Sequence, residues 1–193
     1  MDHFFAFLAE GFDLPLLDFI AEHLSCPFLD AVMPPVTHLA DAGILWILLA
    51  AALLFFPKYR KAGLTMAVAL ILGLVVCNIT LKPLLARIRP YDYQLEQFRK
   101  TIPLLIAAPH DYSFPSGHTL ASFEAATALL LYHKKAGLAA LLLAVLIAFS
   151  RLYLYVHYPT DVLASILLGI GFAFLAKFLV QKGYDHRWQK CQH

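Results

Sequence analysis

The stretch "AGLTMAVALILGLVVCNITLK", residues 62–82, carries no charged side chain before its final lysine. A helix needs about 20 predominantly apolar residues to cross the hydrocarbon core of a bilayer, and this stretch has that length. Four further stretches, residues 39–56, 116–132, 136–154 and 159–180, have similar length and apolar character. The sequence therefore predicts an all-α fold, a polytopic membrane helical bundle with about five to six transmembrane helices.

The composition of the whole chain agrees with a membrane protein. Of its 193 residues, 61% are hydrophobic and only 15% are charged, well below the roughly 25% that is usual in soluble domains. The formal net charge of +2 is too small to indicate a nucleic-acid partner. The cysteines at 26, 77 and 191 have no metal-ligand spacing, and Cys77 lies inside an apolar run, so a disulfide framework is not expected.

Three regions follow from this pattern. Residues 1–38 mix apolar side chains with acidic residues such as Asp18 and Asp30, which predicts an amphipathic segment lying in the membrane interface. A sixth, imperfect span is the alternative for this segment. Residues 39–182 form the transmembrane domain, and residues 183–193 form a cytoplasmic tail. No cleavable signal peptide is evident, because the first residues are acidic rather than basic.

Short basic loops indicate the orientation in the cell membrane. The loops "PKYRK" (57–61) and "HKK" (133–135) and the tail at 182–190 fall on one side of a five-helix bundle, which the positive-inside tendency makes cytoplasmic. The loop 83–115 is then extracytoplasmic. It is nevertheless basic, with Arg87, Arg89, Arg99 and Lys100, so its cations are expected to serve something other than topology.

The first polar stretch at the outer ends of the predicted helices is "KPLLARIRP", residues 82–90. Lys82 and Arg89 are seven residues apart, so a continuous helix would place both on one face. Pro90 is expected to end that helix at Arg89. Two cations snorkelling at a helix end are the alternative interpretation.

The second stretch is "FPSGH", residues 114–118. Ser116 is expected to cap a helix, and Gly117 would let another group approach the backbone closely. A helix N-terminus binds anions through its free N–H groups and its dipole, so His118 would lie beside a bound anion. A capped helix with an incidental histidine is the alternative.

The third stretch is "SRLYLYVHYPTDV", residues 150–162. Pro159 fits the first turn of the last helix, and Asp161 lies in that turn, four residues after His157. A carboxylate there can accept a hydrogen bond from one imidazole nitrogen of His157, which fixes the tautomer. Arg151 adds a third cation at the end of the preceding helix.

Taken together, the three stretches place cations, N–H donors, imidazoles and a carboxylate on one side of the membrane, a combination that suits a phosphate group. The patterns K-x6-R-P, P-S-G-H and S-R-x5-H-x3-D, in this order, resemble the three signature motifs of the type-2 phosphatidic acid phosphatase superfamily. The resemblance covers about residues 40–180, with no departure inside the motifs. It does not extend to the N-terminal segment or to residues 91–113.

The resemblance implies roles for the motif residues. His157 would be the nucleophile that forms a phosphohistidine, and Asp161 would orient its ring. His118 would protonate the leaving oxygen and then activate water. The phosphoryl oxygens would be held by Lys82, Arg89, Ser116, Gly117 and Arg151. No cofactor and no metal are expected, because these cations take the role that magnesium plays in many phosphoryl-transfer enzymes.

The resemblance also implies the class of substrate, a phosphomonoester or diphosphate of a membrane lipid in the bilayer. Undecaprenyl diphosphate, phosphatidylglycerol phosphate and phosphatidic acid are the candidates, and the compact chain with an outward-facing site favours the first. A lipid phosphotransferase and a non-catalytic lipid-binding or transport protein are the alternatives. A soluble vanadium haloperoxidase is opposed by the apolar spans. A zinc site at His110, His118 and His157 is opposed by the nearby cations.

Two polar residues inside the predicted spans, Glu124 and Asn78, are second-shell candidates. An intramembrane carboxylate is functional by default, but Glu124 could instead be a buried partner for Asn78 or for a cation of the first stretch. His110, Asp111 and Tyr112 are expected either to tether their loop or to form a lid or headgroup contact. The sequence does not indicate the oligomeric state.

Overall fold

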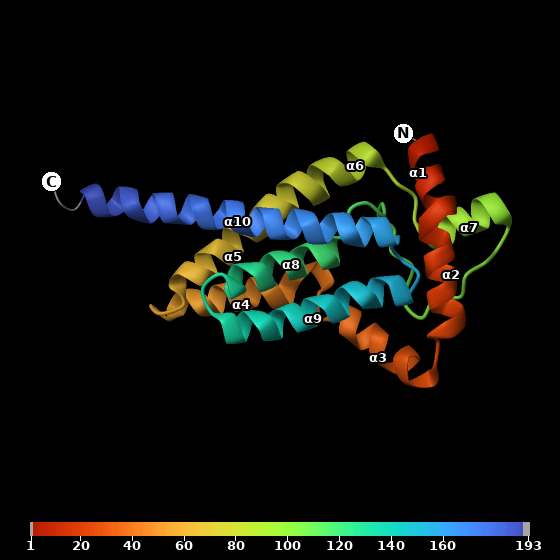
Figure 1. The fold of residues 1–193 in the computed structure, drawn as a ribbon, viewed down its shortest axis with the longest axis horizontal. Coiled ribbons are helices and arrows are strands. Elements are labelled where there is room, and N and C mark those ends of the chain that lie inside the picture. The colour runs from red at the N-terminus through yellow and green to blue at the C-terminus, as the bar shows by residue number, and fades with distance from the viewer. Residues whose placement is uncertain (1, 191–193) are drawn as a thin grey trace.

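A computed structural model describes residues 2–190, and every regular element in that part of the chain is helical (Figure 1). The all-α prediction is therefore confirmed. The elements are α1 (Asp2–Leu8), η1 (Ala9–Asp13), α2 (Leu14–His23), α3 (Pro27–His38), η2 (Asp41–Gly43), α4 (Ile44–Phe55), α5 (Arg60–Gly73), η3 (Leu74–Leu81), α6 (Lys82–Leu85), α7 (Pro90–Phe98), α8 (Gly117–Leu130), α9 (Lys134–Tyr153) and α10 (Pro159–Lys190).

The helix α8 lies at the centre of the bundle and packs against α5, α9 and α10, while α4 packs on α5. Large apolar side chains such as Met66, Phe123 and Ile147 fill the core around it. The indole of Trp46 is also buried there, and its N–H donates to the Ser122 hydroxyl at 3.0 Å. A buried indole needs such a partner, so this bond holds α4 in a fixed position against α8.

In the described part of the chain, three helical stretches are long and apolar enough to cross a membrane: Arg60–Phe98, Lys134–Tyr153 and Pro159–Tyr184. A fourth is formed if the pair Pro27–His38 and Asp41–Phe55, bent by 42°, counts as one span. The helix α8 has 14 residues, fewer than the roughly 20 that a straight crossing requires. A count of five to six spans therefore stays a prediction.

The segments α1, η1 and α2 follow one another without a break and form an N-terminal rod that lies across one end of the bundle (Figure 1). One face of the rod is buried, with Asp13 and Leu17 fully covered. The opposite face exposes phenylalanines, including Phe7 and Phe19. The amphipathic, interfacial segment that the sequence predicts for residues 1–38 stays a prediction.

The chain between Lys82 and Pro90 differs from its predicted course. Helix α6 ends at Leu85, because Ala86 adopts the left-handed conformation with φ of 45°. Pro90 then begins the new helix α7 instead of ending an old one, which suits proline at a first helical position. Lys82 and Arg89 therefore do not share one helix face. At the other end of the chain, α10 continues to Lys190, and residues 191–193 of the predicted tail lie outside the described residues.

Candidate active site

A cavity of about 1100 Å³ opens where one end of the helical bundle meets the loop 99–116. Its polar end contains most of the residues that the three sequence stretches single out: Lys82, Arg89, Gly117, His118, Arg151 and His157. Its other end is an apolar wall from α4, α5 and the start of η3, formed by Ile47, Ala51, Leu54, Leu70, Ile71 and Leu74. One continuous space therefore joins a cationic site to an apolar channel.

His157 lies in the turn between α9 and α10 and is 1% exposed. A guanidinium N–H of Arg89 points at its Nε2 at 3.4 Å, and because arginine can only donate, Nε2 is assigned the free lone pair. The ring proton is then on Nδ1. The pKa of His157 is held well below its usual value, first by burial of the ring and then by the charges of Arg89, Arg151 and Lys82. The imidazole is therefore neutral and has a lone pair available at neutral pH.

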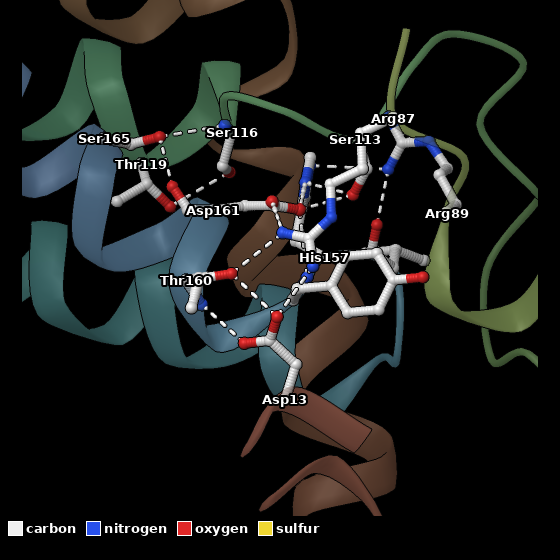
Figure 2. A network of polar contacts seen from close by, with 12 residues as sticks. Asp13, Arg87, Arg89, Ser113, Ser116, Thr119, His157, Thr160, Asp161 and Ser165 are labelled. Carbon is white, nitrogen blue, oxygen red and sulfur yellow. Dashed lines mark hydrogen bonds and ion pairs between the residues drawn. The ribbon is translucent and has the colours of Figure 1, made fainter. Parts of the chain in front are cut away.

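Asp161 approaches His157 less directly than the sequence predicts. The distance from Nδ1 of His157 to Oδ2 of Asp161 is 3.6 Å, too long for a hydrogen bond. The Ser113 hydroxyl lies beside both groups, donating to Asp161 at 2.5 Å and lying 3.4 Å from Nδ1 of His157 (Figure 2). Ser113 thus links the ring to the carboxylate, a role that no sequence motif indicates.

Lys82 and Arg89 meet at a shared acidic partner despite the helix break. Lys82 donates to one carboxylate oxygen of Asp111 and Arg89 donates to the other, each at 2.5 Å. Burial alone would raise the pKa of the Asp111 carboxyl, but the hydrogen bonds and charges of Lys82 and Arg89 hold it well below its usual range. Asp111 is therefore an anion that forms ion pairs with both cations of the first motif.

Arg151 is buried at the end of α9, and it still has bonding capacity. Its NH1 donates to the Thr37 hydroxyl at 2.5 Å. Its Nε has no hydrogen-bond partner among residues 2–190, although the side chain lines the cavity. A buried guanidinium N–H without a partner is costly, so this group is ready to bind an anion in the cavity.

His118, in the first turn of α8, has a carboxylate partner from a distant part of the chain. Its Nε2 lies 2.9 Å from Asp41 in η2, and Asp41 also contacts His38 at 2.8 Å. The sequence motifs contain no acidic partner for His118, and no local pattern marks Asp41. The structure therefore pairs each of the two site histidines with an acidic group, His118 directly and His157 through Ser113.

The N-terminus of α8 begins at the predicted residue, but Ser116 does not make the predicted capping hydrogen bond. Ser116 occupies the N-cap position, yet its hydroxyl contacts Thr119 at 3.0 Å and makes no cap bond to the backbone. Its own N–H donates to the Ser165 hydroxyl (Figure 2). Among the described residues, Gly117 and His118 line the cavity but Ser116 does not. A phosphate contact from Ser116 would need its hydroxyl to turn away from Thr119.

Glu124 and Asn78 both line the cavity, but they do not pair with each other. Oε1 of Glu124 and Oδ1 of Asn78 are buried without hydrogen-bond partners in the described part of the chain. Glu124 packs against Gly73 of α5, where any β-carbon would lie 2.1 Å from the carboxylate. Neither alternative partner that the sequence suggests for Glu124, Asn78 or a cation of the first motif, is found.

Several residues that shape this site are not marked by any sequence motif. Asp13, Asp41 and Ser113 lie outside the motifs, and Arg87 stands out only as a further cation of the basic loop 83–115. The positive charge of that loop is the one sequence signal that points to Arg87. The assembled groups can hold a phosphoryl group with cations, attack it with a neutral imidazole, and move a proton through a second imidazole.

The chain matches the PAP2 superfamily over residues 60–185. An undecaprenyl-diphosphatase of Sulfolobus acidocaldarius is 37% identical over 132 residues, which are 68% of this chain and 61% of that protein. The solved structure of Aquifex aeolicus LpxE superposes with a TM-score of 0.71 at 30% identity, over 85% of this chain and 93% of that one.

A second solved structure, a PAP2-type phosphatidylglycerolphosphate phosphatase from Bacillus subtilis, superposes with a TM-score of 0.65 at 27% identity. It covers 95% of this chain and 93% of the other. The family match includes all three polar stretches and both site histidines, and the superposition extends over the bundle that carries them. This chain belongs to the PAP2 superfamily.

Proposed function

We propose that this chain is a membrane lipid phosphatase that hydrolyses a lipid phosphomonoester or diphosphate through a phosphohistidine on His157. The observation that carries the proposal is the single cavity that contains His157, His118 and three cations at one end and an apolar wall at the other. A lipid could keep its chain along that wall while its phosphate reaches the cations.

The reaction would proceed in two displacements. The Nε2 lone pair of His157 attacks phosphorus, and the bond from phosphorus to the leaving oxygen breaks as His118 gives that oxygen a proton. A water molecule then attacks phosphorus and passes a proton to His118, the phosphorus–nitrogen bond breaks, and inorganic phosphate leaves. Lys82, Arg89 and Arg151 stabilise the charge on the phosphoryl oxygens in both steps.

The proposed mechanism needs no metal, because the cations of the cavity perform the electrostatic task. Undecaprenyl diphosphate is the proposed substrate, in line with the name of the Sulfolobus relative, an undecaprenyl-diphosphatase. In that case His157 attacks the terminal phosphorus, and the leaving group is undecaprenyl phosphate, which keeps the inner phosphate.

The test is turnover by the purified full chain on a panel of undecaprenyl diphosphate, phosphatidylglycerol phosphate and phosphatidic acid, with excess chelator. We expect phosphate release from at least one lipid, fastest from the diphosphate, and inhibition by vanadate. Phosphatase activity that disappears in chelator and returns with magnesium or zinc would contradict the metal-independent mechanism. Failure on all three lipids would contradict the function.

A further inference from the structure

A buried carboxylate of the N-terminal rod reaches the start of the last helix. Asp13, the final residue of η1, is 0% exposed. It accepts hydrogen bonds from the backbone N–H of Thr160 at 2.9 Å and from the Thr160 hydroxyl at 2.7 Å (Figure 2). Thr160 is the second residue of α10, so Asp13 satisfies a free N–H at the beginning of the helix that carries Asp161.

Arg87 connects Asp13 to Asp161. One terminal nitrogen of Arg87 donates to Asp161 at 2.5 Å and the other donates to Asp13 at 2.7 Å (Figure 2). The guanidinium carbon lies 3.7 Å from the ring centroid of Tyr158 and 4.8 Å from that of Phe5, so the fork is fixed between two aromatic rings. A planar fork can bridge two carboxylates in this way, whereas a lysine ammonium cannot reproduce its geometry.

The charges of this network bear on the chemistry at His157. Arg87 by itself would cancel the charge of Asp161, because the two form a buried ion pair. Asp13 adds a second carboxylate to the same guanidinium, so with both carboxylates ionised the three groups carry one net negative charge. An imidazole becomes cationic when it bonds to phosphorus, and His157 would do so close to Lys82, Arg89 and Arg151.

We propose that Asp13 and Arg87 are positioning residues for phosphotransfer, which hold Asp161 in place and keep one net negative charge beside His157 as its imidazole becomes cationic. This inference rests on the proposed function. Asp13 lies outside residues 60–185, the part of the chain that matches the family. The N-terminal rod therefore completes the active site instead of merely covering it.

The test uses Asp13→Asn in the purified full chain, with radiolabelled 4-nitrophenyl phosphate and rapid quenching to follow phosphoenzyme formation. The asparagine keeps the shape of the side chain and removes its charge. Removing a supporting partner of a site residue typically costs about 10- to 100-fold, and we expect a fall of that size in the rate constant of the burst. The acid limb of the pH profile should move to lower pH, because the protonated imidazole has lost a nearby anion.

Glu10→Gln is the matched control. Glu10 lies three residues earlier on η1 and accepts a hydrogen bond from Tyr93 at 2.6 Å, and it forms no ion pair with Arg87. It should leave both the burst rate constant and the pH profile unchanged. Arg87→Lys is the second variant, and it should also slow the burst, because one ammonium cannot serve both carboxylates.

The kinetics of the burst distinguish a positioning role of these residues from an effect of the substitutions on folding. Loss of folded protein lowers the burst amplitude, which counts active sites, but leaves the rate constant and the position of the acid limb unchanged. An unchanged rate constant and pH profile in Asp13→Asn and Arg87→Lys would overturn the inference while leaving the proposed function intact. An equal effect of Glu10→Gln would also overturn it. A wild-type protein that forms no phosphoenzyme would overturn the proposed function, and the inference with it.

Discussion

Asp111 occupies the donors that an incoming phosphate would need. Its two carboxylate oxygens take hydrogen bonds from Lys82 and Arg89, the cations of the first motif. Its side chain is 54% exposed and lies on the loop 99–116, so it can be displaced without unpacking the core. We therefore expect Asp111 to compete with phosphate for these cations.

Asp111→Asn should bind inorganic phosphate more tightly. The amide keeps the size of the side chain but no longer offers a charged acceptor, so Lys82 and Arg89 become available to the anion. A gain of about 1.4 kcal/mol corresponds to a tenfold lower inhibition constant for phosphate, and we expect a change of about this size. Competitive inhibition of turnover by phosphate measures it.

The control for this prediction is Glu96→Gln, which removes one exposed acidic charge from α7. It should leave the inhibition constant for phosphate close to that of the wild type. If Asp111→Asn binds phosphate no better than the control, then Asp111 does not compete for the site.

Residues within the motifs were accessible to sequence reasoning because each lies at a helix end, where capping, proline position and short spacings act locally. The long-range partners were not. Asp41 lies 77 residues from His118, and Asp13 lies 74 residues from Arg87. Such contacts arise only when the bundle brings distant segments together, and no helical periodicity encodes them. Ser113 is close to its motif, but its link to His157 depends on the fold of the preceding loop.

Among the elements, the break at Ala86 shows where local propensity misleads. Alanine is the best helix former, and the left-handed conformation costs a residue with a β-carbon roughly 1–2 kcal/mol. The sequence therefore gives no reason to end a helix there. In the structure the loop 99–116 pairs with the broken segment, since the N–H of Ser113 donates to the carbonyl of Arg87 at 2.8 Å. Tertiary contacts decide this boundary.

The contact between α5 and α8 gives a prediction about stability. A β-carbon at Gly73 would lie 2.1 Å from Oε1 of the buried Glu124 side chain, so the carboxylate would have to shift. Overpacking of this kind typically costs about 1–3 kcal/mol, so Gly73→Ala should lower the melting temperature measured in detergent. Combining it with Glu124→Ala should recover part of the loss that Gly73→Ala causes.

Gly171 provides the comparison for that experiment. It lies on α10 with nothing within 4 Å of an added β-carbon. Gly171→Ala should be neutral or stabilising by up to about 1 kcal/mol, because alanine favours helix over glycine. A Gly73→Ala variant as stable as Gly171→Ala would show that the close contact with Glu124 can relax freely.

For the whole molecule, Figure 1 places the basic loops before α5 and before α9 at the end of the bundle opposite the N-terminal rod. The candidate site lies at the same end as the rod, since Asp13 of the rod contacts Arg87 and Thr160 there. From the positive-inside tendency we predict that the basic loops are cytoplasmic and that the site faces the other side of the membrane. The composition of the chain predicts a helical membrane bundle, whereas the 42° bend before α4 is seen only in the structure.

Cysteine labelling tests the orientation. In a background without the native cysteines, Lys134→Cys should react with an impermeant maleimide only after the cytoplasmic side is opened. Gln97→Cys, on exposed α7, should react in intact cells. The reverse labelling pattern would place the site in the cytoplasm.

The most direct test of the account is to find which histidine carries the phosphoryl group during turnover. The protein is mixed with radiolabelled 4-nitrophenyl phosphate and quenched rapidly, and the acid-labile phosphate is mapped. The label should lie on His157. His157→Ala should trap none. His118→Ala should still become labelled with this activated substrate and accumulate the intermediate, while hydrolysis of a lipid phosphate falls by about 10²–10⁴-fold. Label on His118, or label that persists in His157→Ala, would contradict the account.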